Sequence, residues 1–463
     1  MAHLSAQALA KRRAIRLSGI FALCLMLGGL ALTTYARDLD RPADEDLSLV
    51  SERLPAERNA LTPLLQAMKN LHYPDDFVDS ADLIDLAIIG AAWNPDWVAT
   101  LLRNNAKALA HFERARHTAA FQLRVRSTQG ERRVLDSWIM LAKLRALEIR
   151  LQSLRGDGEA ALHSTLALAH FGARIRELDG GRMVHYLTGI SVIRVALEAL
   201  QRILKDVVLD PSQADEVFRS LEALRLAREG WSQVARGDYQ WSKGVLDESV
   251  AARDAEGGVG SRDPFAREVL DSMLSLSPIW YSVQRNRTLR RLGDHYRVSI
   301  AQVPSTCREW GVREHGIEML PQAPSVFSLN RNALGDYWAD LARTSIQLYR
   351  RTSCVSESNI SAVQVMIALR AFEADRGHMP NTLDELVPDY FAEVPLDYFD
   401  GDPIRYFPER HLIYSVGSDL ADARGERKPG EPCNAELSFP IPFATPDHVT
   451  AVPARITCGV SRS

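Results

Sequence analysis

The sequence lacks the short motifs that mark common catalytic and nucleotide-binding sites. It contains no glycine-rich phosphate loop, no HExxH zinc motif and no GxSxG nucleophile motif. A missing motif does not exclude an enzyme, because acid–base carboxylates leave no linear signature. We therefore predict no catalytic and no cofactor-binding residue from the sequence.

Net charge is also low, at −4 over 463 residues. A general nucleic-acid binder concentrates positive charge on one face, whereas the arginines here alternate with Asp and Glu, as on solvated helix faces. No nucleic-acid partner is expected. Hydrophobic residues make up 46% of the chain, which is enough to bury sizeable cores, and the length favours two or three domains.

Acidic residues are absent from residues 1–16, which are basic, and residues 17–36 carry no charge at all. As a helix, this run would just span a hydrocarbon core of about 30 Å, and the basic cluster favours a cytoplasmic start. We expect a single-pass anchor in the bacterial inner membrane, with the bulk of the chain in the periplasm. A signal peptide that is cleaved after Ala36, which would release the protein into the periplasm, is the alternative.

Cysteine is scarce, with five in the chain. Cys24 lies in the apolar run, and the other four lie in the last third, outside any CxxC or Cys/His cluster that would bind zinc. In an exported region, four cysteines permit two disulfides in three connectivities. We expect Cys433 to pair with Cys458 in the proline-rich tail, and scattered buried thiols are the alternative.

Apolar residues at spacings of three and four dominate residues 47–350 and predict an irregular antiparallel array of helices. One helix should end at Gly156, the next should begin near Glu159, and Pro211 should open a later helix. The helical pair over about 138–176, with its RGDGEAAL turn and small packing residues, resembles one tetratricopeptide repeat.

Near the C-terminus the chain changes to Pro, Asp, Gly and aromatic residues. A capping box at Ser361 predicts the start of a helix there, with Ser356 as an earlier alternative. Gly377 should end this helix, and the capping box Thr382–Glu385 should open one or two further helical turns.

Two short segments after this helix, at 403–407 and 411–417, are rich in aromatic and β-branched residues. They predict a β-hairpin, reached through a tight loop at 397–402. An isolated hairpin is marginally stable, so one face should pack on the preceding helix through Leu369 and Phe372.

The segments DRGHMP, LDELVP, VPLDYFDGDPIRY and IYSVGSD follow one another within residues 361–425. In this order they resemble the periplasmic domain of the major pseudopilin of type II secretion. A pseudopilin carries its hydrophobic helix, with a Glu near its start, directly before this domain. Here a long helical region intervenes and the apolar run has no Glu. The chain is therefore expected to be a helical protein with a similar terminal domain.

The resemblance also implies a calcium site in the loop after the second strand. Asp419 and Asp422 match its first acidic positions, but Arg424, Arg427 and Lys428 stand where later acids would be. Calcium needs six to eight oxygen ligands and gains from negative charge. A solvated turn is therefore favoured over a calcium site at this loop.

Four further groups contain residue types that binding sites use, and each has a favoured structural interpretation. Two histidines on one helix suit packing or the surface, adjacent acids suit a helix cap, paired tryptophans around a proline suit a helix start, and clustered arginines suit a solvated face. The groups are His163 with His170, Asp75 with Asp76, Trp93 with Trp97, and Arg285, Arg287, Arg290 and Arg291.

These features predict a mainly α fold. An irregular antiparallel helical array follows the N-terminal transmembrane or signal helix, and a small α+β module of helix plus β-hairpin ends the fold. The expected function is that of a non-catalytic interaction protein, with envelope or secretion-system proteins and inner-membrane lipid as partners. The alternative is a periplasmic hydrolase acting on glycan or lipid. The expected regions are a basic segment (1–16), the anchor (17–36), a polar linker (37–46), the helical domain (47–350), the pseudopilin-like module (351–430) and the tail (431–463).

Overall fold

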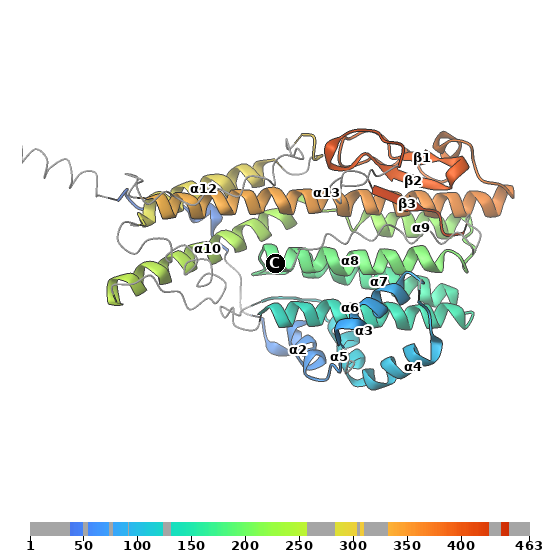
Figure 1. Cartoon of the computed structure of the whole chain (residues 1–463), viewed down its shortest axis with the longest axis horizontal. Coiled ribbons are helices and arrows are strands. Elements are labelled where there is room, and N and C mark those ends of the chain that lie inside the picture. The colour runs from blue at the N-terminus through green and yellow to red at the C-terminus, as the bar shows by residue number, and fades with distance from the viewer. Residues whose placement is uncertain are drawn as a thin grey trace, which may run out of the picture.

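Helices form most of the computed structural model, and one small sheet lies near its C-terminal end (Figure 1). The prediction of a mainly helical chain with a small α+β part is confirmed. The structure describes residues 38–49, 54–73, 77–90, 92–123, 131–256, 283–302, 306–309, 332–425 and 437–443. The predicted anchor at 17–36 lies outside these residues.

The first helices along the chain are α2 (Leu61–Lys69), α3 (Phe77–Ile88), α4 (Pro95–Asn104), α5 (Ala106–His117), α6 (Glu131–Leu154) and α7 (Gly158–Arg176). They are followed by α8 (Met183–Ile203), α9 (Pro211–Glu222), α10 (Arg228–Glu256), α12 (Arg285–Ala301) and α13 (Ala333–Arg376). Local signals fixed several of these ends. Gly156, at φ +89°, follows α6, and Asp210 caps α9 by accepting from the backbone N–H of Gln213.

The central helix α8 packs against α6, α7, α10 and α13. Gly189 permits the close approach of α7, because a Cβ at this position would lie 2.3 Å from the backbone nitrogen of Arg176. Among the described helices, α8 is the one whose length and hydropathy would suit a membrane span. However, 72% of its apolar window is buried inside the protein, as expected of a core helix.

The 44 residues of α13 run along most of the molecule (Figure 1). The predicted helix start at Ser361, and its alternative at Ser356, are wrong, because α13 begins at Ala333 and passes both positions, and the expected boundary at 350, without a break. Its end agrees with the prediction, since Gly377 is left-handed at φ 75°. Thr382 and Glu385 form the expected capping box of the short 3-10 helix η4 (Leu383–Leu386).

Two hydrophobic cores lie along α13. The main core joins α2 to α9 with the C-terminal half of α13 and the sheet. The second core joins the start of α8 with α10, α12 and the N-terminal half of α13. α13 contributes to both, with Leu369 in the first and Ile346 in the second, so the helical array and the C-terminal module share one helix.

The sheet contains the predicted hairpin and one additional strand. β1 (Arg405–Phe407) pairs antiparallel with β2 (Leu412–Ser415), and β2 also pairs antiparallel with β3 (Leu437–Pro440). β3 falls in the segment expected to be a proline-rich tail. Ile413 of β2 joins the main core with Leu369 and Phe372. The expected packing of one hairpin face on the helix is therefore present.

The predicted polar linker (37–46) overlaps residues 38–47, which are docked on α10 and α12. Leu47 is 1% exposed and belongs to the second core. Three of its acidic residues, Asp38, Asp44 and Asp46, bind groups of those helices, as described below. We call residues 38–47 the strap.

Candidate functional site

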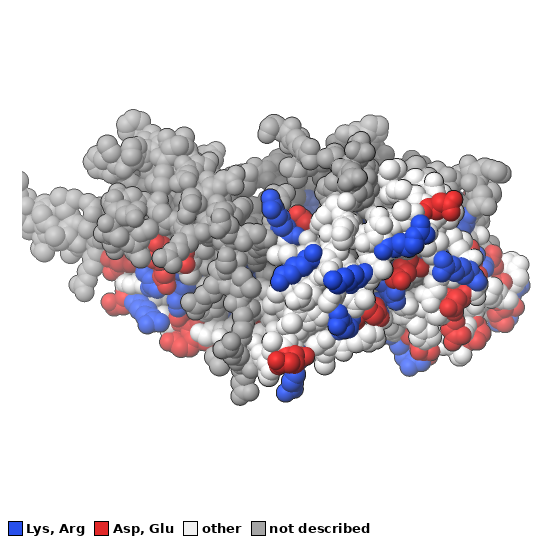
Figure 2. Space-filling model, turned by 90° about the horizontal axis from the view of Figure 1, so that it is seen from below, with Lys and Arg blue, Asp and Glu red and all other residues white. Residues whose placement is uncertain are grey.

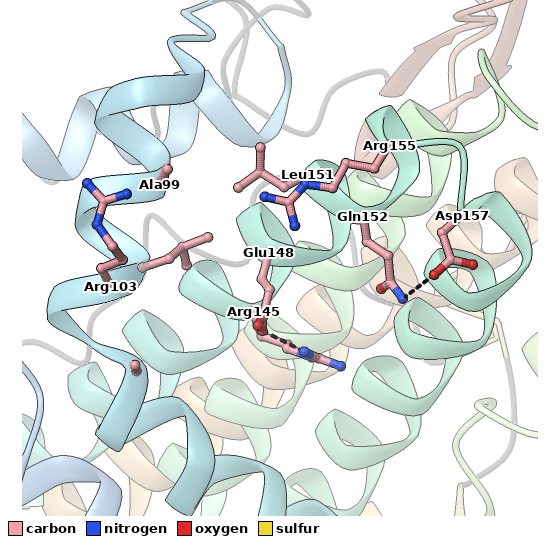
Figure 3. A pocket seen from close by; sticks show the side chains of 10 residues that line it. Ala99, Arg103, Arg145, Glu148, Leu151, Gln152, Arg155 and Asp157 are labelled. Atoms are coloured by element: carbon pink, nitrogen blue, oxygen red, sulfur yellow. Dashed lines mark hydrogen bonds and ion pairs between the residues drawn. The ribbon is translucent and has the colours of Figure 1, made fainter.

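An open groove separates α4 and the start of α5 from the C-terminal half of α6 (Figure 3). Its volume is about 710 Å³. Apolar side chains lie beside three arginines and two carboxylates, so the groove combines an apolar surface with charged groups. Its lining residues are Ala99, Leu102, Arg103, Ala106, Arg145, Glu148, Leu151, Gln152, Arg155 and Asp157.

Local sequence signals build both walls. On one side, Asn94 caps α4 by accepting from the backbone N–H of Trp97 at 3.1 Å. Buried Asn105 fixes the corner between α4 and α5, because its side chain donates to the carbonyl oxygens of His72 and Leu101, both at 3.0 Å. On the other side, the left-handed Gly156 ends α6 and turns the chain into α7.

The two carboxylates of the groove are already engaged. Glu148 accepts from Arg145 at 2.5 Å, and Asp157 accepts from Gln152 at 3.3 Å; Figure 3 draws both contacts. Arg145 also lies 3.8 Å from Glu113 of α5. These carboxylates therefore act as acceptors for neighbouring side chains and do not face each other as an acid–base pair.

Two arginines on opposite walls, Arg103 and Arg155, are exposed. The Arg103 guanidinium donates to the hydroxyl of Thr100 at 2.9 Å, and Arg155 extends from the α6–α7 turn towards α4 (Figure 3). Within the described part of the chain, neither guanidinium has a carboxylate partner. The groove therefore presents positive charge that its own acids do not neutralise.

Arg116 of α5, which does not line the groove, is a cation with a buried side chain. Its side chain is 5% exposed and its Nη2 lies 3.4 Å from Glu113, while its Nε and Nη1 have no hydrogen-bond partner. Burial lowers the pKa of Arg116, and Glu113 partly offsets this effect. Glu113 of α5 therefore lies within ion-pair distance of both Arg116 and Arg145 and offsets part of their positive charge.

Across the molecule, charge of one sign does not dominate the face that α2, α4 and α5 form. Figure 2 shows basic side chains across the middle of this face, with acidic side chains between them and towards both ends. The arginines of the groove are therefore a local feature and not part of one continuous basic surface.

Asp419 and Asp422 lie in tight turns after β2. Asp419 accepts from the backbone N–H of Ala421 at 3.0 Å, and Asp422 accepts from that of Arg424 at 2.9 Å. Among the described residues, no three His, Cys, Asp or Glu side chains come together as metal ligands. The preference for a solvated turn over a calcium site at this loop stays a prediction.

The disulfide in the described residues joins Cys307 to Cys354. The backbone N–H of Cys307 donates to the carbonyl of Tyr398 at 2.9 Å, so the bridge also holds the loop before the hairpin against α13. The predicted pair, Cys433 and Cys458, lies outside the described residues.

Of the other sequence candidates, those within the described residues do not line the groove. His163 is exposed, and His170 contacts Ser220 of α9 at 2.9 Å. Trp93 and Trp97 pack against the main core at the start of α4, as predicted. The Arg285–Arg291 cluster divides, with two arginines paired and two exposed; Asp75 and Asp76 lie outside the described residues.

Sequence reasoning did not single out Arg103 and Arg155. They are far apart in the chain, occupy no motif and resemble many other helical arginines. Only their position on facing walls distinguishes them. The chain matches no family model, no curated protein and no solved structure in comparisons with known proteins.

Proposed function

We propose that this protein is a non-catalytic interaction protein of the bacterial envelope, and that its groove binds an anionic segment of an envelope partner. The observation that carries the proposal is the pair of exposed guanidinium groups, Arg103 and Arg155, on facing walls beside apolar side chains. Guanidinium groups bind carboxylates and phosphates through two parallel hydrogen bonds. A segment with acidic and apolar residues would match both features of the groove.

Two further observations support a periplasmic location behind an inner-membrane anchor. The Cys307–Cys354 disulfide suits an oxidising compartment. The order of helix end, capping box, loop and hairpin between Gly377 and Ser415 agrees with a pseudopilin-like module, and this agreement supports a link to secretion or pilus-type assembly. The partners would then be secretion-system or other envelope proteins.

A hydrolase acting on glycan or lipid is the weaker alternative. Such an enzyme needs two carboxyl groups that face the scissile bond from opposite sides. Glu148 and Asp157 line the groove, but each is bound to a neighbouring side chain. Hydrolysis of peptidoglycan or phospholipid that Glu148→Gln abolishes would favour the enzyme over the interaction protein.

Affinity purification of the full chain from membranes of its native host tests the proposal. The wild type should recover secretion or pilus-type subunits, and the double variant Arg103→Glu with Arg155→Glu should lose them. Arg58→Glu is the matched control, because Arg58 is also exposed but lies in the short 3-10 helix at 56–58, outside the groove. Equal recovery by the double variant, or no envelope protein with the wild type, would contradict the proposal.

A further inference from the structure

The first residue of the strap caps α12. The Asp38 carboxylate accepts from the backbone N–H groups of Asn286 at 2.7 Å and Arg287 at 3.1 Å. The side chain of Asn286 donates in return to the carbonyl of Leu39 at 2.8 Å. These donors would otherwise be unsatisfied at the helix start, where the helix dipole also favours a negative charge. The beginning of the strap is thus fixed at the N-terminus of α12.

The middle of the strap is buried against α10. Asp44 is 5% exposed and accepts from the Tyr239 hydroxyl at 2.8 Å and from Lys243 at 2.5 Å. Gln240 donates to the carbonyl of Leu47 at 3.0 Å. A buried carboxylate is tolerated only with such partners, so this contact specifies one position of the strap.

The third contact is made to Arg297 of α12. Its Nε and Nη2 each donate to the Asp46 carboxylate at 2.8 Å, and Nη2 also donates to the carbonyl of Ala43 at 2.7 Å. This is a bidentate pair, the strongest form of arginine–carboxylate contact. The strap is therefore held at three separate points by two helices.

The short stretch of chain between the predicted anchor and the strap limits how far the helical part of the protein can lie from the membrane. The predicted anchor ends at Ala36, and Asp38 is already docked, so the two intervening steps can span only about 7 Å. The N-terminus of α12 would then lie at the lipid headgroups. The exposed Arg287 and Arg290 of α12 have no carboxylate partner in the described part of the chain, and guanidinium groups suit headgroup phosphates.

We propose that the strap holds the α12 end of the body against the membrane surface, where Arg287 and Arg290 contact phospholipid phosphates. This inference rests on the membrane anchor of the proposed function. α13 starts beside α12, since Asn332 accepts from the backbone N–H of Gln284, and its 44 residues extend about 65 Å. The residues after Gly377, which form η4 and the sheet, would therefore lie far from the lipid (Figure 1).

The test places a fluorescent non-natural amino acid at position 290 or at position 389 of the full chain. Asp389 is exposed and follows η4 beyond the far end of α13. The protein is reconstituted in vesicles of phosphatidylethanolamine and phosphatidylglycerol with a short-range quencher on the headgroups. Emission at 290 should be quenched several-fold more than emission at 389.

A strap variant and a matched control separate docking from anchoring. Asp44→Asn with Asp46→Asn should reduce the quenching at 290, whereas Asp40→Asn with Glu45→Gln should not, since both latter side chains are exposed. Circular dichroism checks that each variant is folded. If the double variant does not fold, Asp46→Asn alone is used in its place. Equal quenching at 290 and 389 in a chain that resists carbonate extraction would overturn this inference alone. Extraction by carbonate would overturn the anchor as well.

Discussion

The two ends of α13 are stabilised by different kinds of contact. At the module end, α13 packs against the sheet and η4, and capping boxes and a left-handed glycine mark the turns. At the strap end, α13 packs against α12. α12 in turn binds the strap, which lies some 250 positions earlier in the chain. Contacts between residues close together in the chain can be recognised as sequence motifs, whereas contacts between distant segments cannot.

The buried ionic network near the middle of α13 belongs to the second kind. Arg225, after α9, lies 3.3 Å from Glu357 and donates to Ser361 at 3.2 Å and to Gln364 at 2.8 Å. Ser361 and Gln364 are the first and last residues of the wrongly predicted capping box. Their side chains accept hydrogen bonds from the guanidinium of Arg225, which lies between α9 and α10, so the same pattern serves a tertiary contact here.

The acids of the two regions also differ in pKa. Burial raises the pKa of Glu357, although Arg225 and Arg176 oppose this effect. Burial would likewise raise the pKa of Asp44, but the hydrogen bonds from Lys243 and Tyr239 outweigh it and lower the pKa. The hydrogen bond from Arg297 lowers the pKa of Asp46. As the pH falls, Glu357 of the network should therefore take up a proton before Asp44 and Asp46 of the strap do.

Removal of Glu357 should have the largest effect on stability. Glu357→Ala leaves Arg225 and Arg176 without their buried counter-charge, which costs about 3–5 kcal/mol. Urea unfolding measures this loss. Glu222→Ala is the control, because Glu222 also pairs with Arg225 but its side chain is 53% exposed; it should cost less than about 1 kcal/mol. Similar losses in the two variants would argue against a critical buried network.

Opening the disulfide should rank second. Cys354→Ser should cost about 2–4 kcal/mol, because the bridge closes a long loop in the unfolded chain. Thermal unfolding measures the change. Cys307→Ser should match it, and the double variant should add little to either single variant, since all three open the same bridge. Additive losses would show that the thiols act separately.

The strap should give a smaller effect that depends on pH. Asp44→Asn should cost about 1–2 kcal/mol at pH 7. Because the folded pKa of Asp44 is lowered, this stabilisation is present above the unfolded value of about 3.9 and is lost as the pH falls through the folded pKa. The difference in melting temperature between wild type and variant should shrink below about pH 4. A constant difference down to pH 3 would contradict the assigned ion pair.

The smallest effect should come from glycines at the strap end. Gly244→Ala in α10 meets no atom within 4 Å and should stabilise the protein by about 0.5–1 kcal/mol through helix propensity. Gly293→Ala in α12 would place its methyl 3.4 Å from Leu47 of the strap and 3.2 Å from Arg297, which should offset this gain. Chemical denaturation compares the two, and an equal gain would show that the strap is loosely packed.

Much of the local structure could be predicted from residues close together in the chain. Gly156, Pro211, Gly377 and the Thr382–Glu385 capping box each set an element boundary as expected, because backbone conformation and capping act over a few positions. The groove could not be predicted, since Arg103 and Arg155 meet only when α4 packs beside α6. β3 was missed because its partner β2 lies beyond an intervening segment.

The sequence by itself determined a mainly helical chain, the ends of many of its helices, the hairpin and an uncharged N-terminal run long enough to span a bilayer. Only the tertiary structure decided that α13 is continuous, that Cys307 pairs with Cys354, and that Asp38, Asp44 and Asp46 are docked on α10 and α12. The reason is physical. Helix periodicity and capping depend on neighbours, whereas disulfides, buried ion pairs and grooves depend on which distant surfaces meet.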